Sequence, residues 1–360
     1  MIEDLARHPA VAIWETTRAC DLACLHCRAS AVSQRAPDEL STAEAYDLLD
    51  QLVDLGPRVL VLTGGDPLKR PDLLAIVEAA TARGLHVALA PSVTPLLTAE
   101  AIARVARAGV RRIALSLDGP DAACHDGLRG VPGSFEATLR AIGHVRDANV
   151  PLQINTSVTA ATAVRLHSVG RLVERLRPAL WSVFFVVPVG RARQSQQVDA
   201  ATSERLFHWL YDCTARTGLA VKTTAAPAYR RVVLQREAAR ARSDPAYRRR
   251  PIPPGVTDGK GFVFVSHRGA VYPSGFLPVS VGNVRRDRLV DLYRWSPVFR
   301  DLRSPWKLEG KCGVCAFQVV CGGSRARAYA VSGNYLGEDP ACAYEPSRYR
   351  RDAPVLAQRA

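Results

Sequence analysis

The chain has 360 residues, 48% of them hydrophobic, and an excess of basic residues gives it a formal net charge of +14 at pH 7. Its length suits one large domain with a smaller one. No apolar stretch reaches the roughly 18 residues of a membrane span, and no signal peptide is predicted, so we expect a cytoplasmic protein that does not bind membranes. No basic patch interleaved with aromatic residues indicates nucleic-acid binding, and nine cysteines in a non-secreted chain indicate metal or catalytic use.

Six apolar runs alternate with helix-like segments between residues 11 and 217. The predicted strands are Val11–Thr17, Arg58–Gly64, His86–Ser92, Arg111–Asp118, Pro151–Thr159 and Leu180–Val189. The predicted helices lie near 41–55, 71–84, 99–108, 134–148, 161–177 and 202–217. Such alternation predicts parallel pairing, and near-continuous apolar runs are typical of strands buried on both faces. The pattern alone fits a doubly wound sheet or an open barrel, and both place ligand sites at the C-terminal ends of the strands.

Three cysteines follow the first predicted strand with the spacing Cys-x3-Cys-x2-Cys: Cys20, Cys24 and Cys27. Fe–S clusters are normally held by four thiolates, so three leave one iron open to a small molecule. The alternative is a zinc knuckle or chance clustering. Structural zinc takes four protein ligands, and His26 is the one local candidate for the fourth.

This cysteine spacing resembles the signature of the radical S-adenosylmethionine (radical SAM) enzymes. The resemblance implies that Cys20, Cys24 and Cys27 hold a [4Fe–4S] cluster whose open iron binds the amino and carboxylate groups of S-adenosylmethionine. An electron from the cluster then cleaves the sulfonium and releases a 5′-deoxyadenosyl radical. The resemblance also selects, within the α/β class, a partial (β/α)6 TIM-like barrel that is open on one side.

A Gly-Gly-Asp-Pro sequence follows the second predicted strand: Gly64, Gly65, Asp66 and Pro67. It resembles the Gly-Gly-Glu-Pro pattern of the radical SAM family, with Asp66 as a conservative departure. Adjacent glycines let backbone approach a ligand closely. We expect exposed carbonyl groups at this strand end, or the Asp66 carboxylate, to receive the ammonium group of S-adenosylmethionine.

Other candidates for cofactor binding lie at the ends of the fourth and fifth strands. Ser116 and Asp118 point to the same side of a strand and are candidates for binding the ribose hydroxyls, although a simple strand-to-loop turn is the alternative. By the resemblance, Arg129 pairs with the cofactor carboxylate. Asn155 is a candidate on the adenosine side, and His26 a candidate for packing against adenine.

The segment 228–256 is rich in Arg and ends rich in Pro, with a predicted helix over Val232–Arg242. We interpret it as a bridge between domains, and a solvated linker is favoured over a substrate-binding role because runs of charge are usually solvated. A β-hairpin is predicted after it, over 261–273. The predicted division is a radical SAM barrel domain 1–227, a linker 228–256, an auxiliary-cluster domain 257–346 and a tail 347–360.

A second set of cysteines lies in the C-terminal part: Cys312, Cys315, Cys321 and Cys342. Four thiolates complete a [4Fe–4S] cluster or bind a zinc ion, and ligand count does not separate the two. Resemblance to the SPASM/Twitch extension of radical SAM enzymes favours an auxiliary Fe–S cluster. The full SPASM pattern has another cluster, and Ser274 and Arg325 stand where two of its cysteines would be. We therefore predict two clusters with about eight irons in all.

The sequence from Cys321 to Cys342 resembles radical SAM proteins of alternative heme and heme-d1 biosynthesis. That resemblance implies hydrogen abstraction from a propionate of a tetrapyrrole, with the side chain then lost or decarboxylated, and Arg191 and Arg193 are placed to hold carboxylates. An external one-electron reductant such as flavodoxin or ferredoxin is expected. The second hypothesis is cross-linking or epimerisation of a ribosomally made peptide, disfavoured by the lack of a leader-binding domain ahead of Cys20. The third, a non-catalytic Fe–S electron-transfer protein, leaves the open iron unexplained.

Overall fold

A sheet of ten strands forms the centre of the fold in the computed structural model, which describes residues 2–249 and 255–349. The strands lie in the order β10-β9-β8-β1-β2-β3-β4-β5-β6-β7, and neighbours from β8 to β7 pair in parallel. Their bounds are β1 (Val11–Glu15), β2 (Val59–Thr63), β3 (Val87–Leu89), β4 (Arg112–Ser116), β5 (Leu152–Val158), β6 (Leu180–Phe185), β7 (Val221–Thr224), β8 (Phe262–Val265), β9 (Ala270–Tyr272) and β10 (Gly282–Asn283).

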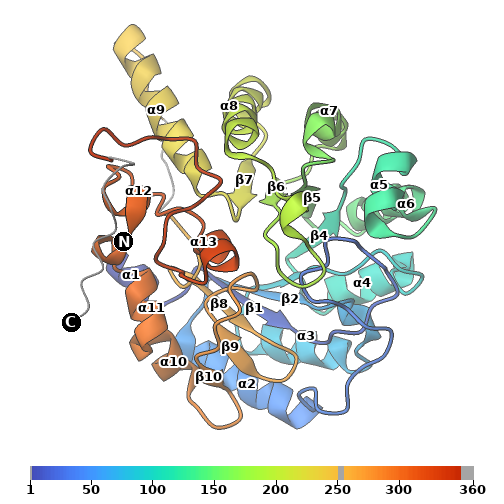
Figure 1. Cartoon of the computed structure of the whole chain (residues 1–360). Coiled ribbons are helices and arrows are strands. Elements are labelled where there is room, and N and C mark those ends of the chain that lie inside the picture. The colour runs from blue at the N-terminus through green and yellow to red at the C-terminus, as the bar shows by residue number, and fades with distance from the viewer. Residues whose placement is uncertain (1, 250–254, 350–360) are drawn as a thin grey trace.

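Helices cover the outer face of this curved sheet, with α2 to α8 arranged around it (Figure 1). The helices are α1 (Ile2–Arg7), α2 (Thr42–Leu55), α3 (Leu73–Ala82), α4 (Ala99–Arg107), α5 (Ala122–Arg129), α6 (Ser134–Asp147), α7 (Leu166–Leu176), α8 (Ala200–Thr217), α9 (Ala228–Ser243), α10 (Leu289–Trp295), α11 (Pro297–Leu302), α12 (Gly310–Gly313) and α13 (Arg325–Ser332). Short 3-10 turns are η1 (Pro67–Lys69), η2 (Ala163–Arg165), η3 (Gln194–Gln196) and η4 (Pro305–Lys307).

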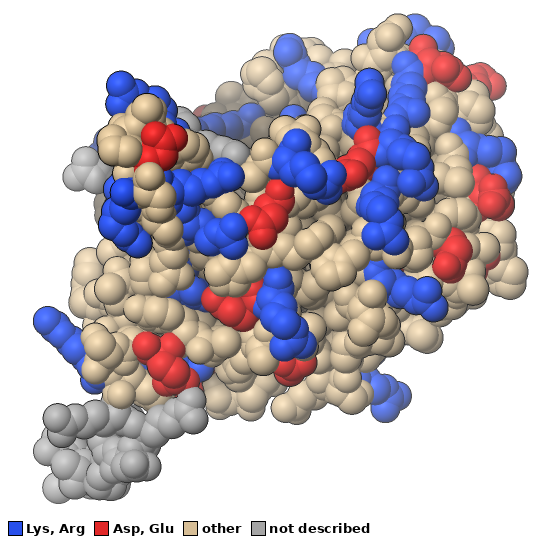
Figure 2. Space-filling model, turned by 90° about the horizontal axis from the view of Figure 1, so that it is seen from above, with Lys and Arg blue, Asp and Glu red and all other residues tan. Residues whose placement is uncertain are grey.

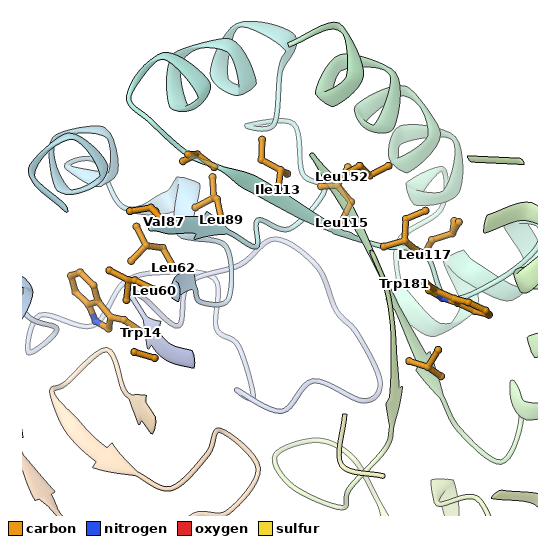
Figure 3. Packing of buried hydrophobic residues seen from close by; sticks show 14 of the residues in the cluster. Trp14, Leu60, Leu62, Val87, Leu89, Ile113, Leu115, Leu117, Leu152 and Trp181 are labelled. Atoms are coloured by element: carbon orange, nitrogen blue, oxygen red, sulfur yellow. The ribbon is translucent and has the colours of Figure 1, made fainter. Parts of the chain in front are cut away.

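The hydrophobic core lies between the sheet and these helices. Leu62, Leu89 and Ile113 are fully buried there (Figure 3). Burial alternates along β5, so one face packs under the helices while the other faces the inside of the barrel. The expectation of strands buried on both faces therefore holds for β3, whose residues are all buried, and for the middle of β4 and of β6. It is wrong for β5, where every second residue is partly exposed toward the inside of the barrel.

The six predicted strands are present, and the partial (β/α)6 barrel is confirmed. Two strands extend it. β7 pairs in parallel with β6, and β8 pairs in parallel with β1 as well as forming the predicted hairpin with β9. β7 was not predicted because its sequence, Val-Lys-Thr-Thr, has too few apolar residues to stand out.

The segment interpreted as a linker begins with α9, a helix longer than predicted. α9 packs on α8, because Val232 is fully buried and the Tyr211 hydroxyl donates a hydrogen bond of 2.9 Å to Glu237 Oε1. The first half of the segment is thus a docked helix and not solvated chain. Residues 250–254, and the tail from residue 350, lie outside the described residues. The division into domains stays a prediction, and the sheet runs across it without a break at β8–β1.

Basic side chains are spread over the face seen in Figure 2, in several groups with acidic side chains between them. This distribution agrees with the net charge of +14. In the part of the chain that the structure describes, no helix is both long enough and apolar enough to cross a membrane.

Candidate active site

A cavity of about 230 Å³ opens at the C-terminal ends of the parallel strands. The three cysteines of the loop after β1 line it together with residues at the ends of the strands. These strand-end residues are Thr63, Ser92, Ser116, Asn155, Ser157 and Phe184. The cysteine loop therefore lies where a parallel α/β sheet places its ligands, as predicted.

The cysteine loop is an irregular segment that is fixed by neighbours far away in the sequence. Cys20 N donates to Val32 O at 2.7 Å, which closes the loop on itself. Leu25 N donates to Leu128 O in α5 at 3.1 Å, and Arg191 N donates to Cys27 O at 2.9 Å. Because these anchors come from separate elements, the positions of the three thiols depend on the folded barrel.

The sulfur of each cysteine in the loop has an N–H donor within hydrogen-bond distance. Leu22 N lies 3.4 Å from Cys20 Sγ, and Ala31 N lies 3.4 Å from Cys27 Sγ. Arg129 Nη1 lies 3.7 Å from Cys24 Sγ. Donors of this kind stabilise sulfur ligands of a metal cluster. Burial nevertheless raises the pKa of Cys20, so its thiolate form needs the positive charge that a bound metal supplies.

The glycine pair after β2 is packed against the cysteine loop. Gly65 N donates to Thr17 O at 2.8 Å. A Cβ on Gly64 would lie 2.6 Å from Thr17 O, and one on Gly65 would lie 2.5 Å from Ala19 O. Both glycines also line the cavity. The absence of side chains at Gly64 and Gly65 thus allows close approach to the backbone of Thr17 and Ala19. The expectation from the sequence was close approach to a ligand.

We expect Gly65→Ala to displace the cysteine loop and to cost about 1–3 kcal/mol of stability, the usual range for forcing extra atoms into a packed site. Binding of S-adenosylmethionine and of iron should weaken with it. Gly143→Ala is the matched control, because Gly143 lies in α6 and a Cβ there meets nothing within 4 Å. Urea denaturation and iron content measure both variants. Equal stability and iron in the two would contradict this role for Gly65.

Asp66 and Pro67 lie behind the glycines and do not line the cavity. The Asp66 carboxylate is fully buried and accepts hydrogen bonds from Thr94 Oγ1 at 2.7 Å and from Leu68 N at 3.2 Å. Burial raises the pKa of Asp66. Its contacts hold the turn that begins η1, and they leave its carboxylate facing protein groups.

Ser116 and Asn155 line the cavity as predicted, but Asp118 is not among its lining residues. Asp118 is fully buried, forms an ion pair with Arg129, and accepts a hydrogen bond from Ser157 N at 2.6 Å. Burial opposes ionisation of Asp118, but the Arg129 guanidinium, the two nearby histidines and the hydrogen bond from Ser157 N together outweigh it, and the pKa of Asp118 is lowered. Asp118 therefore positions Arg129, whose guanidinium lines the cavity beside Cys24. Roles in binding the ribose and the cofactor carboxylate stay predictions.

Three side chains in the cavity wall carry buried nitrogen atoms without partners among the described residues: Nδ1 of His26, Nε of Arg129, and Nε and Nη2 of Arg191. Burial lowers the pKa of His26 to about 4, so its ring is neutral at pH 7. A neutral ring and an unpaired guanidinium suit a ligand with an aromatic part and a carboxylate. Arg193, the other arginine predicted to hold carboxylates, is exposed and lies outside the lining.

Several residues of the cavity wall were not predicted. Ser92 ends one predicted strand and Ser157 lies near the end of another, and their polar side chains at that edge are the signal that was available. Arg28 was missed because its partners are distant in sequence. It pairs with Glu15 at 2.5 Å and lies over the ring of Phe264. Since Glu15 also contacts His267 Nδ1 at 2.8 Å, this group ties the cysteine loop to the C-terminal hairpin.

His125, on α5, also lines the cavity and supports Asp118 from the other side. Asp118 N donates to His125 Nδ1 at 3.1 Å, so this nitrogen carries no proton. Burial is the main cause that lowers the pKa of His125 to about 4. The side chain is almost fully buried, and its neutral form is part of the folded structure.

We expect acid to destabilise the fold through His125 well above the range where carboxylates titrate. The unfolded chain binds a proton there near pH 6.5, and the folded chain does so only near pH 4. The contribution of neutral His125 to the free energy of unfolding is therefore fully present above about pH 6.5. It falls by about 3 kcal/mol as the pH drops to about 4. Urea denaturation across this range should give a shallower pH dependence for His125→Gln. His86→Gln, at an exposed position, is the control and should match the unsubstituted protein.

The four C-terminal cysteines line one cavity of their own, together with Arg231, Lys311, Phe317 and Tyr344. Phe317 N lies 3.4 Å from Cys315 Sγ, and Gly323 N lies 3.4 Å from Cys321 Sγ. Burial is the main cause that raises the pKa of Cys321 to about 12 and that of Cys342 to about 11. As in the first site, thiolates here need a bound positive group.

Comparison with known proteins identifies related sequences over nearly the whole chain. The Radical SAM superfamily matches residues 14–161. An AdoMet-dependent heme synthase of Nitratidesulfovibrio vulgaris is 42% identical over 339 residues, which is 93% of this chain and 92% of the relative. One from Methanosarcina barkeri is 40% identical over 342 residues, 94% and 98% of the two chains.

More distant relatives carry other names. Fe-coproporphyrin III synthase of Methanosarcina barkeri is 26% identical over 92% of this chain and 87% of the relative. Mycofactocin maturase MftC of Mycobacterium ulcerans is 29% identical over 97% and 90%. Among solved structures, Streptococcus suis SuiB bound to S-adenosylmethionine matches with a TM-score of 0.72 at 16% identity, covering 94% of this chain and 78% of that one. This last similarity concerns the fold.

Proposed function

This chain belongs to the radical SAM superfamily, and from that premise we propose that it decarboxylates propionate side chains of an iron tetrapyrrole to make a heme-like product. Membership makes it an enzyme that uses a [4Fe–4S] cluster and S-adenosylmethionine, so the interpretation as a non-catalytic electron-transfer protein is set aside. The observation that carries the substrate class is the similarity of at least 40% to two AdoMet-dependent heme synthases over more than nine-tenths of each chain.

The residues of the cavity fit the cluster and the cofactor. Cys20, Cys24 and Cys27 would hold the cluster, with donors already beside their sulfurs. Arg191 would pair with a carboxylate, since its guanidinium has buried nitrogens without partners among the described residues and faces the cavity. The neutral ring of His26 would pack against the adenine. When bound, the cluster and S-adenosylmethionine supply a 5′-deoxyadenosyl radical.

The substrate chemistry has a defined balance. Iron coproporphyrin III carries four propionates, and heme has vinyl groups in place of two of them. Each conversion removes one hydrogen atom from the carbon next to the ring and then carbon dioxide, and it releases one electron. The residues around the cavity must therefore bind a carboxylate and exclude water from the carbon radical. The protein must also supply an acceptor for the released electron.

We assign the second cysteine set to an auxiliary [4Fe–4S] cluster, which would provide an electron acceptor. The four cysteines line one cavity, and four thiolates are the number that completes a [4Fe–4S] cluster. The resemblance to the SPASM/Twitch extension favours this cluster over a zinc ion, which four thiolates would also bind.

The two positions where a further SPASM cluster would have cysteines are occupied by other interactions. Ser274 Oγ donates to Asp258, which also accepts from Ala326 N at 3.1 Å. Arg325 Nη1 donates to Gly337 O at 2.6 Å, and its Nη2 lies 3.5 Å from Cys312 Sγ. Hydrogen bonds thus replace ligands at both positions, in keeping with two clusters and not three.

The test is an anaerobic turnover assay with protein whose Fe–S clusters have been reconstituted. Dithionite, or a flavodoxin as the one-electron reductant, is supplied with S-adenosylmethionine and iron coproporphyrin III. We expect 5′-deoxyadenosine formation to rise with the tetrapyrrole. Each of two successive steps should lower the mass of the tetrapyrrole by that of carbon dioxide and two hydrogen atoms. Slow cofactor cleavage that no tetrapyrrole changes would overturn the proposal.

Peptide modification is the second candidate, because mycofactocin maturase MftC matches 97% of this chain. Its identity of 29% is well below the 42% of the heme synthase, so the tetrapyrrole is favoured. Under peptide modification, addition of a precursor peptide instead of a tetrapyrrole would stimulate 5′-deoxyadenosine formation in the same assay.

A further inference from the structure

A second cavity, of about 470 Å³, lies at the open edge of the barrel, where β7 is not paired with β8. It is enclosed by β7, the first turns of α9, the segment 256–258 and the residues just before α13. α13 lies between β8 and β7 in Figure 1. Apolar side chains such as Val221, Val233 and Phe262 form much of its wall. Its volume falls in the range of about 300–1,000 Å³ that is usual for small-molecule sites.

Two basic side chains face this cavity without an acidic partner. Among the described residues, the Lys222 ammonium makes no hydrogen bond or ion pair, and its charged neighbours are Arg112 and Arg230. Arg230 donates from Nη2 to Val256 O at 2.8 Å, while its Nη1 is buried with no partner in the described part of the chain. Lys222 has access to the cavity, yet the surrounding protein desolvates it and lowers its pKa to about 8.

The acidic residues in the cavity wall are engaged elsewhere. Glu237 accepts hydrogen bonds from Tyr211 at 2.9 Å and from Tyr247 at 3.0 Å. Asp258 accepts from Ser274 and from Ala326 N. The buried Nη1 of Arg230 has no partner in the described part of the chain, and a buried cationic group is costly unless an anion joins it. The cavity therefore has the features of a site for a largely apolar molecule that carries negative charges.

The second cavity adjoins the cysteine-loop cavity. Phe276 contributes to the walls of both, and its ring centroid lies 6.4 Å from that of Phe184, which lines the cysteine-loop cavity. Phe276 is therefore the side chain that the two cavities share, and a molecule that occupied both would pass it.

We propose that the second cavity holds the non-reacting part of the substrate, an apolar body whose carboxylates pair with Lys222 and Arg230 while the reacting side chain passes Phe276 toward Cys20, Cys24 and Cys27. This inference rests on the proposed function, which supplies a substrate with several carboxylates. A tetrapyrrole has the required chemistry, a flat apolar ring with propionates at its edge. Lys222 and Arg230 are binding residues in this assignment and take no part in the bond changes.

Absorbance titration of the reconstituted protein with iron coproporphyrin III tests the assignment without turnover. We expect Lys222→Gln and Arg230→Gln each to weaken binding by at least about 10-fold, the loss of one charge-assisted hydrogen bond. Lys260→Gln is the matched control, since Lys260 lies close to Arg230 but outside the cavity wall and donates to Val319 O at 2.7 Å. It should bind within about 2-fold of the unsubstituted protein.

A second probe separates charge pairing from damage to the fold. The tetramethyl ester of the same tetrapyrrole carries no carboxylate, so the unsubstituted protein and Lys222→Gln should bind it equally. Iron content checks Arg230→Gln, because Arg230 lies near Cys321. If the acid binds the unsubstituted protein and both variants equally, this assignment is wrong and the proposed function stands. If the acid does not bind the unsubstituted protein at all, the proposed function fails and the assignment fails with it.

Discussion

Replacing Cys20, Cys24 and Cys27 together by alanine is expected to abolish 5′-deoxyadenosine formation and to leave about half of the bound iron. The three thiols line one cavity, and no cysteine of the second set lines it. Removing them should therefore take away one four-iron cluster and leave the other, so that iron falls from about eight to about four per chain. Colorimetric iron analysis and chromatography of 5′-deoxyadenosine measure the two effects.

Two controls make this result specific. Cys312→Ala with Cys315→Ala should also remove about four irons but should leave slow cleavage of S-adenosylmethionine. Cys213→Ala should retain all the iron and all the activity, because Cys213 is a buried core residue on α8 outside both cavities. Unsubstituted protein with about four or about twelve irons would contradict the count of two clusters, and cleavage by the triple variant would contradict the role of the loop.

The sequence was informative where function depends on residue types at fixed short spacing. The six strands and the cysteine loop were predicted because apolar runs and thiol spacing are local patterns. Ser116 and Asn155 were found because polar side chains at strand ends lie on the ligand side of a parallel sheet. The family resemblance supplied what those patterns left open, the choice of an open barrel over a doubly wound sheet.

Contacts between distant segments set the features that could not be predicted. Asp118 looks in sequence like a ligand-binding residue at a strand end, and only the fold reveals that Arg129 and Ser157 occupy its carboxylate. The role of Gly64 and Gly65 was also not predictable, because the atoms that leave no room for a Cβ there belong to Thr17 and Ala19. Lys222 lies in a strand too polar to predict, so the cavity that it faces was not expected.

The ion pair of Asp118 with Arg129 is the second large effect. We expect Asp118→Asn to cost about 3–5 kcal/mol of unfolding free energy, the usual result of leaving a buried charge without its partner. The Asp118 side chain is fully buried and that of Arg129 is 12% exposed, and asparagine keeps the size of the side chain and an oxygen that can accept from Ser157 N. The loss is therefore assigned to the charge. Because the pKa of Asp118 is lowered, its contribution is complete at neutral pH and is lost as the pH falls below about 4.

Two comparisons separate this effect from a general loss of packing. Asp118→Asn combined with Arg129→Gln removes both charges, and it should recover part of the stability that the single variant loses. Asp50→Asn breaks an exposed ion pair with Arg83 and should change stability little. Urea denaturation of the metal-free proteins measures all three. A single variant as stable as Asp50→Asn would mean that Arg129 has another counter-charge. A double variant less stable than the single one would mean that Arg129 stabilises the fold through its contact with the cysteine loop and not through Asp118.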